Sequence, residues 1–117
     1  MTQLLVVEDQ PLVANALRRA LRAAGYEPSC ASSCTGAMHH AGYFPCAVMD
    51  IDLGDGDGIE LAERLIGLGR LGGVVFHSGC CDPSRERRAR ALGELVVKSQ
   101  GSVDRVVDAL GFVMRTH

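Results

Sequence analysis

Residue types that could bind a metal ion and transfer a charged group follow four short apolar segments of the sequence. Two of these segments end in carboxylates, one ends in a hydroxyl and one in an ammonium group. The residues concerned are Glu8 and Asp9, Asp50, Ser78 and Lys98. Lys98 is the only lysine of the chain, and it directly follows an apolar run, where a solvated charge is not expected.

This set of side chains favours phosphoryl chemistry with a metal ion. Carboxylates held together repel, since two unit charges about 4 Å apart interact by roughly 4 kcal/mol at an effective dielectric constant of 20. Carboxylate oxygens with room for water suit Mg²⁺, a hard cation that also binds phosphate oxygens. The ion and Lys98 would neutralise a phosphoryl donor, and Ser78 would hydrogen bond a transferred oxygen. Asp50 would then be the nucleophile that forms an acyl phosphate.

The elements that must position these residues follow from the alternation of apolar segments with helical patterns. Such alternation is typical of strand-helix units around a parallel sheet. We therefore expect an α/β fold with a doubly wound five-stranded parallel sheet. The carboxyl ends of its strands would bring the four polar positions to one edge, where ligands of such sheets bind. We expect strands at about 3–7, 27–31, 46–49, 74–77 and 95–97, and helices at about 11–25, 33–42, 59–67, 83–92 and from Ser102, which would cap the last helix.

Two further expectations concern segments outside these elements. The stretch 52–58 contains three glycines, which predicts a loop. Within it, Asp55 and Asp57 are interpreted as turn and helix-cap residues.

Length, composition and charge limit the class of protein. The 117 residues, 47% of them apolar, are enough for one domain, which we place at 1–117. A net charge of −2 gives no general attraction to nucleic acid or to an anionic membrane, so we expect neither as a direct partner. No apolar run approaches the roughly 18 residues of a membrane span, and the start lacks the pattern of a signal peptide. We expect a cytoplasmic protein.

The remaining reactive or charged residue types suggest no second site. The cysteines are odd in number and lack Cys-x-x-Cys pairs, so we expect them to be reduced and mostly buried, with Cys80 and Cys81 as reactive exceptions. The histidines at 39, 40 and 77 show no metal-ligand spacing and no acidic partner. Arginines at 85, 87, 88 and 90 are interpreted as a solvated helix face, or as a surface for an acidic protein.

The order Glu8-Asp9, Asp50, Ser78, Lys98 resembles the active site of the response-regulator receiver family. The loop from Met49 to Gly58, which ends in Asp-Gly, is similar to the family's segment after its phosphorylated aspartate. The resemblance covers nearly the whole chain, and it implies the flavodoxin-like (βα)5 receiver fold.

The resemblance also implies a role for each matching residue. Asp50 would be phosphorylated by a histidine kinase or a histidine phosphotransfer protein. Glu8, Asp9, Asp50 and the backbone carbonyl of Asp52 would bind Mg²⁺, while Ser78 and Lys98 would contact the phosphoryl group. The domain would not be a turnover enzyme, since it would catalyse only its own phosphoryl uptake and hydrolysis. An output protein, or a second copy in a homodimer, would bind the surface of the fourth helix, fifth strand and fifth helix.

Three positions depart from the family pattern. Ser99 follows Lys98 where the family usually has a proline in a cis peptide. Leu95 stands where an aromatic residue usually rotates on activation, and Gly54 stands where proline is frequent. With these departures, a degenerate receiver that binds a partner constitutively is an alternative. The chain is either a single-domain regulator, which we expect, or part of a longer protein.

Two other functions fit part of the pattern. Asp50-x-Asp52 with a later Ser78 and Lys98 also resembles haloacid-dehalogenase-type phosphatases, but their motif normally lies on the first strand, and Glu8 would have no role. The acidic run from Asp50 to Asp57 suggests a calcium-binding loop, but the EF-hand register requires glycine where Asp55 stands. Glu8 and Asp9 could also merely cap the following helix.

Overall fold

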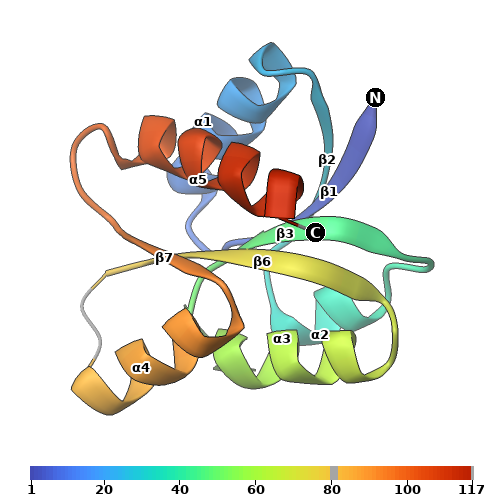
Figure 1. Ribbon diagram of the computed structural model, residues 1–117, viewed down its shortest axis with the longest axis vertical. Coiled ribbons are helices and arrows are strands. Elements are labelled where there is room, and N and C mark those ends of the chain that lie inside the picture. Colours follow the sequence, from blue (N-terminus) through green and yellow to red (C-terminus); the bar gives the residue numbers. More distant parts are fainter. Residues whose placement is uncertain (80–81, 117) are drawn as a thin grey trace.

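The central element of the protein is a five-stranded parallel sheet with the strand order β2-β1-β3-β6-β7 (Figure 1). The structure is a computed structural model that describes residues 1–79 and 82–116. The expected doubly wound α/β fold is confirmed, with each parallel strand close to its predicted place. The strands are β1 (Thr2–Val7), β2 (Tyr26–Ala31), β3 (Phe44–Met49), β6 (Leu71–Ser78) and β7 (Glu94–Val97).

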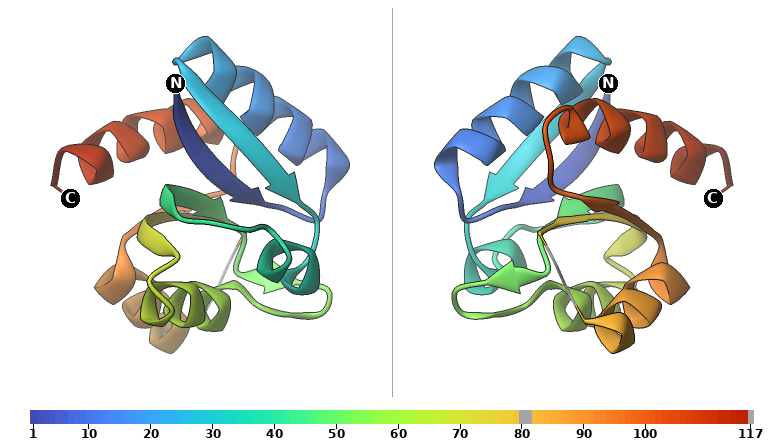
Figure 2. Two further views of the ribbon diagram at one scale, coloured as in Figure 1. Left: turned by 90° about the vertical axis from the view of Figure 1, so that its right-hand side faces the viewer. Right: turned by 90° about the vertical axis from the view of Figure 1, so that its left-hand side faces the viewer.

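Helices cover both faces of this sheet. They form two groups, one on each face, as the views from either side show (Figure 2). The first group contains α1 (Pro11–Ala23) and α5 (Ser102–Thr116). The second contains α2 (Cys34–Met38), α3 (Gly58–Gly67) and α4 (Pro83–Leu92). None of the helices within the described ranges is both long enough and apolar enough to cross a membrane.

The core consists of two apolar layers, one on each side of the sheet, and this explains the continuous apolar runs of the strands. In β1, Leu5 and Val7 belong to the layer beneath α2, α3 and α4, whereas Leu4 and Val6 pack towards α1 and α5. Because successive side chains of a strand point to opposite faces, a strand covered on both faces must be apolar at every position.

The segment 52–58 is not simply a loop, contrary to expectation. It contains a short antiparallel hairpin made of β4 (Asp52–Leu53) and β5 (Gly56–Asp57). Glycine at 56 allows the hairpin to lie against α2, because a Cβ atom there would be 3.0 Å from Sγ of Cys34. Strands of two residues have no periodicity, so the glycine content alone suggested an irregular segment.

Two helices also differ from the predictions. α2 ends at Met38 rather than near Gly42, because the sequence from His39 onward offers no apolar stripe, and Gly42 adopts a positive φ of 90°. Ser102 is the first residue of α5, and its hydroxyl is hydrogen-bonded to His77 instead of capping the helix. In α1 the expected start and end are confirmed. Pro11 lies in the first turn of the helix, and Gly25 follows its end with a positive φ of 93°.

Candidate functional site

The strand order changes direction at β1, and the candidate site lies at the carboxyl ends of β1 and β3 on either side of this point. The two strands are paired so that Val7 lies opposite Met49, and the N–H of Asp50 donates to the carbonyl of Val7 at 2.9 Å. This register places the residues after both strands side by side, at the crevice where doubly wound sheets bind ligands.

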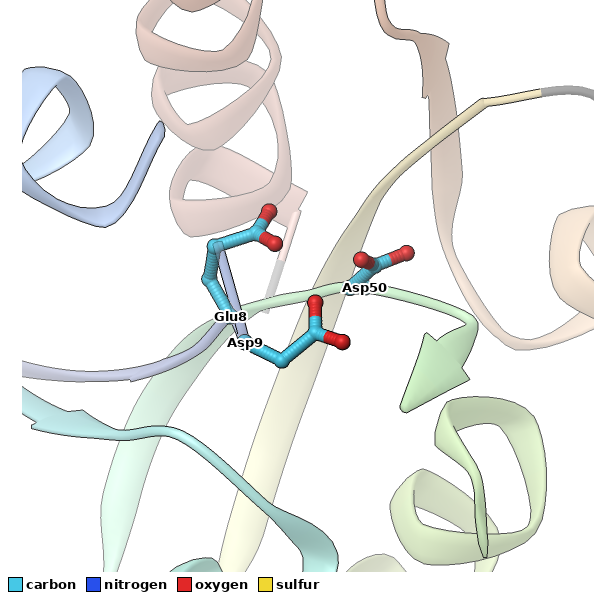
Figure 3. Close-up of side chains that lie close together, drawn as sticks. All are labelled: Glu8, Asp9 and Asp50. Carbon is cyan, nitrogen blue, oxygen red and sulfur yellow. The ribbon is translucent and has the colours of Figure 1, made fainter. Parts of the chain in front are cut away.

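Three carboxylates meet there, as the sequence predicted. Atoms of Glu8, Asp9 and Asp50 that could bind a metal ion all lie within 4.8 Å of one another (Figure 3). Glu8 and Asp50 are buried, at 3% and 5% exposure, whereas Asp9 is exposed. Two of the three carboxylates are therefore buried, and the third faces solvent.

Lys98 joins the two buried carboxylates. Its Nζ lies 2.9 Å from Oδ2 of Asp50 and 2.9 Å from Oε1 of Glu8. Burial by itself lowers the pKa of Lys98, but the hydrogen bonds to Asp50 and Glu8 outweigh this effect and raise the pKa above its ordinary value. Lys98 is therefore a fixed positive charge beside Asp50.

Lys98 alone does not fully neutralise the two buried carboxylates. Burial raises the pKa of Glu8 to about 7, although the hydrogen bond from Lys98 opposes the rise. Oε1 of Glu8 accepts no hydrogen bond from the described residues, although the ammonium lies close to it. An all-oxygen cluster with an incompletely satisfied buried oxygen fits a hard cation such as Mg²⁺. Glu8, Asp9 and Asp50 are the side chains that could hold it.

Ser78 lies at the end of β6, next to this cluster in the sheet. It is completely buried, and its Oγ has no hydrogen-bond partner among the described residues. Its carbonyl accepts a hydrogen bond of 2.6 Å from the N–H of Lys98, which ties the ends of β6 and β7 together. The structure thus places an unpaired hydroxyl and the lysine on neighbouring strand ends, as predicted.

Asp52 belongs to a different set of contacts from the three clustered carboxylates. Its N–H donates to Oδ1 of Asp50 at 3.2 Å, while its exposed carboxylate pairs with Arg85 at 3.0 Å. Arg85 also lies 3.4 Å from Asp57. Sequence reasoning missed this link between α4 and the β4-β5 hairpin, because it treated all four arginines as one solvated face.

The acids of the hairpin act as helix caps. Asp57 caps α3 by accepting from the N–H of Ile59 at 2.7 Å, as expected. Asp55 caps α2 across the chain, because it accepts from the N–H groups of Cys34 and Thr35 at 2.8 and 3.0 Å. By contrast, Glu8 and Asp9 do not cap α1, whose N-cap residue is Gln10 and has no side-chain cap hydrogen bond.

Gly58 determines how closely α3 approaches the site. Its N–H donates to the carbonyl of Ile51 at 2.8 Å, and a Cβ atom at this position would lie 1.9 Å from the carbonyl oxygen of Asp50. The Asp-Gly sequence at 57–58 thus has a physical basis, since the aspartate caps α3 and the glycine leaves room for the backbone of Asp50.

The expectations about the cysteines and about His77 are only partly confirmed. The cysteines were expected to be mostly buried, but Cys30 is exposed and Cys34 half-buried, while Cys46 is buried. Cys30 lies on the edge strand β2, which pairs with β1 on one side and, within the described part of the chain, has no strand on its other side. Cys80 and Cys81 lie outside the described residues. His77, for which no partner was found in the sequence, is buried and hydrogen-bonded to Ser102 at 2.8 Å.

The positions that depart from the family pattern have defined surroundings. The peptide bond before Ser99 is trans, since the described residues contain no cis peptide bond. Leu95 is a buried part of the apolar layer beneath α4. Gly54 has open space around its Cα, so no neighbour requires a glycine there.

Comparison with known proteins identifies the family. The family model of the response regulator receiver domain matches residues 4–99. The chain belongs to this family. Receiver domains are signalling domains rather than classical enzymes, so the phosphatase and the EF-hand are no longer needed to explain the acidic motifs. No curated protein sequence matches the chain significantly.

Solved receiver domains share the fold. The non-phosphorylated HemR receiver domain from Leptospira biflexa has a TM-score of 0.83 at 21% identity, with 97% of this chain and 94% of that chain covered. A CheY-like receiver domain protein from Methanospirillum hungatei has a TM-score of 0.83 at 18% identity, covering 100% and 99%. The response regulator TrrA from Thermotoga maritima, solved in complex with Mg²⁺-BeF, has a TM-score of 0.74 at 23% identity, covering 91% and 99%.

Proposed function

We propose that this receiver domain accepts a phosphoryl group on Asp50 from a histidine kinase or a histidine phosphotransfer protein, in a reaction that depends on Mg²⁺. The observation that carries the proposal is the position of Asp50. It is a buried carboxylate between the ammonium of Lys98 at 2.9 Å and the carboxylates of Glu8 and Asp9.

Each neighbour has a role in the transfer. A carboxylate oxygen of Asp50 bonds to phosphorus, and the bond between phosphorus and the donor breaks, leaving an acyl phosphate. Glu8, Asp9 and Asp50, with the backbone carbonyl of Asp52, would hold Mg²⁺, which supplies positive charge for the phosphoryl oxygens. Lys98 adds a second positive charge, and the unpaired hydroxyl of Ser78 is available to donate to a phosphoryl oxygen. The complex of TrrA with Mg²⁺-BeF supports such a site by analogy.

Phosphorylation would then change binding to a partner protein. The phosphoryl group adds about −1.5 to −2 charge beside Ser78 and Lys98. The proposed output surface consists of α4, β7 and α5; α4 and β7 lie between Ser78 and Lys98 in the chain, and α5 follows Lys98. Leu95 cannot act as an aromatic switch, so we propose that the signal reaches this surface through the backbone of β6 and β7.

Intact-mass spectrometry after incubation with acetyl phosphate tests the proposal. The wild-type protein should gain about 80 Da only when Mg²⁺ is present, and hydroxylamine should remove the gain. Asp50→Asn should show no gain. Asp108→Asn, which removes an exposed acid on α5, is the matched control and should behave as the wild type. A gain that persists in Asp50→Asn would refute the site, and no gain under any condition would favour a receiver that binds its partner constitutively.

A further inference from the structure

The segment from Lys98 to Ser102, which connects β7 to α5, is bound at both ends to two neighbouring residues of β6. At one end, the N–H of Lys98 donates to the carbonyl of Ser78 at 2.6 Å. At the other end, Oγ of Ser102 is hydrogen-bonded to Nε2 of His77 at 2.8 Å. Because only three residues separate Lys98 from Ser102, fixing the position of Ser102 restricts where the lysine can lie.

The middle of this segment is also held by hydrogen bonds. The N–H of Ser102 donates to the carbonyl of Ser99 at 3.1 Å. The guanidinium of Arg105, one turn into α5, donates to Oγ of Ser99 at 2.5 Å. Gly101 provides the turn with a positive φ of 80°.

Packing does not hold the segment on the side of α1. A cavity of about 240 Å³ lies there, lined by Lys98, Ser99 and Ser102 on one side and by Leu12, Val13 and Ala16 of α1 on the other. His77 and Val103 complete the lining. Atoms beside a cavity lack contacts on that side. On the side of α1, therefore, hydrogen bonds rather than close packing hold this part of the chain in place.

Stability alone gives no reason for a histidine and a serine at this place. His77 and Ser102 are 2% and 3% exposed, and Nδ1 of His77 has no hydrogen-bond partner among the described residues. An apolar pair of similar shape would avoid the unpaired buried nitrogen and would be as stable or more stable. What such a pair cannot provide is a hydrogen bond of fixed length and direction between β6 and the first turn of α5.

We infer that His77 and Ser102 are positioning residues, which hold Lys98 where its ammonium bridges Glu8 and Asp50 and can neutralise the incoming phosphoryl group. This inference rests on the proposed function, and it adds two residues to the site that do not touch the phosphoryl group themselves. Their effect is exerted through the backbone between Ser102 and Lys98.

The single lysine of the chain allows a direct test. Protein made with lysine labelled at the ε-carbon gives one side-chain NMR signal, that of Lys98. In the wild type this signal should differ in chemical shift from an exposed lysine and should relax as an ordered methylene. In His77→Leu and Ser102→Ala it should move towards the exposed value and become more mobile.

Two further variants separate positioning from folding. The double variant His77→Leu/Ser102→Ala replaces both polar partners, so it should regain stability in urea unfolding but keep the mobile lysine signal. Ser102→Thr retains the hydroxyl, and the cavity beside residue 102 has room for the additional methyl group. It should therefore keep the ordered signal of the wild type.

Phosphoryl uptake from acetyl phosphate provides the second measurement. The maximal rate of the double variant should fall about tenfold, less than the loss of a hundredfold or more that removing a charge-stabilising donor causes. The Mg²⁺ concentration for half-maximal rate should not change, because the carboxylates are intact. An ordered lysine signal in the double variant, or a mobile signal with an unchanged rate, would overturn the inference. Absent uptake in the wild type would contradict the proposed function instead, and the lysine signal would still decide whether the pair holds Lys98.

Discussion

At the scale of single residues, Gly58 defines how closely the start of α3 can approach Asp50. Replacing it with alanine would place a Cβ atom 1.9 Å from the carbonyl oxygen of Asp50. We expect Gly58→Ala to lower the free energy of unfolding by about 3 kcal/mol, because backbone must move to relieve the overlap. Urea unfolding measures this loss, and phosphoryl uptake should fall with it.

Gly54→Ala is the matched control for this substitution. It makes the same chemical change four residues earlier, in the turn of the hairpin, but nothing lies within 4 Å of the new Cβ atom and the backbone φ is not positive. Its free energy of unfolding should stay within about 0.5 kcal/mol of the wild type. Equal losses in the two variants would show that Gly58 is not needed for close approach.

The buried His77 makes the stability of the protein depend on pH. Burial, followed by the charge of Lys98, lowers the pKa of His77 from its ordinary 6.5 to about 4. Below pH 6.5 the unfolded chain binds a proton that the folded protein does not yet bind. Stability from this residue is therefore complete above pH 6.5 and is lost as the pH falls through the interval from 6.5 to 4.

Comparing the wild type with His77→Leu/Ser102→Ala isolates this contribution. Between pH 7 and pH 5, the double variant should gain about 2 kcal/mol in free energy of unfolding relative to the wild type. Urea unfolding at both pH values gives the difference, and His39→Leu controls for removing an exposed histidine. A difference that does not change with pH would mean that His77 is not held neutral by burial.

At the scale of elements, the hairpin of β4 and β5 stabilises the start of α2. The N–H groups of Cys34 and Thr35 donate to the carboxylate of Asp55, and they lower its pKa to about 2 from the ordinary 3.8. Because the folded pKa is depressed, the stabilisation is complete above pH 3.8 and is lost as the pH falls towards 2.

Asp55→Asn should therefore destabilise the protein at neutral pH, and hydrogen exchange should be faster at the amides of 34 and 35. The difference in stability between wild type and variant should shrink as the pH falls from about 4 towards 2. Asp82→Asn, at the N-cap of α4, is the comparison, and it should leave exchange in α2 unchanged. Unchanged exchange at 34 and 35 in Asp55→Asn would contradict this assignment of the cap.

The elements also show which features a sequence can reveal. The strand ends that carry Glu8, Asp50 and Lys98 were predictable, since parallel strands bring their carboxyl ends to one edge whatever the details of packing. The hairpin at 52–57 was not, because two-residue strands lack a repeating pattern. The contacts of Arg85 with Asp52 and of His77 with Ser102 depend on which helix face meets which strand, and one sequence does not specify that.

At the scale of the whole molecule, a bound metal ion should stabilise the fold. A ligand that binds only the folded state adds about 2.7 kcal/mol at a concentration one hundred times its Kd. We expect Mg²⁺ to raise the free energy of unfolding of the wild type relative to EDTA, and Asp9→Asn to lose most of this gain. Asp108→Asn should keep it. Equal gains in Asp9→Asn and wild type would place the ion elsewhere.

The strand β6 has a further consequence for how the two helical layers communicate. His77 shares its face of the sheet with Val75, towards α1 and α5, whereas Ser78 shares its face with Phe76, towards α3 and α4. Two consecutive residues therefore contact opposite sides of the molecule. A change in the twist of β6 at these two residues would therefore press one side chain against each helical layer, so one local change in the strand would be transmitted to both layers at once.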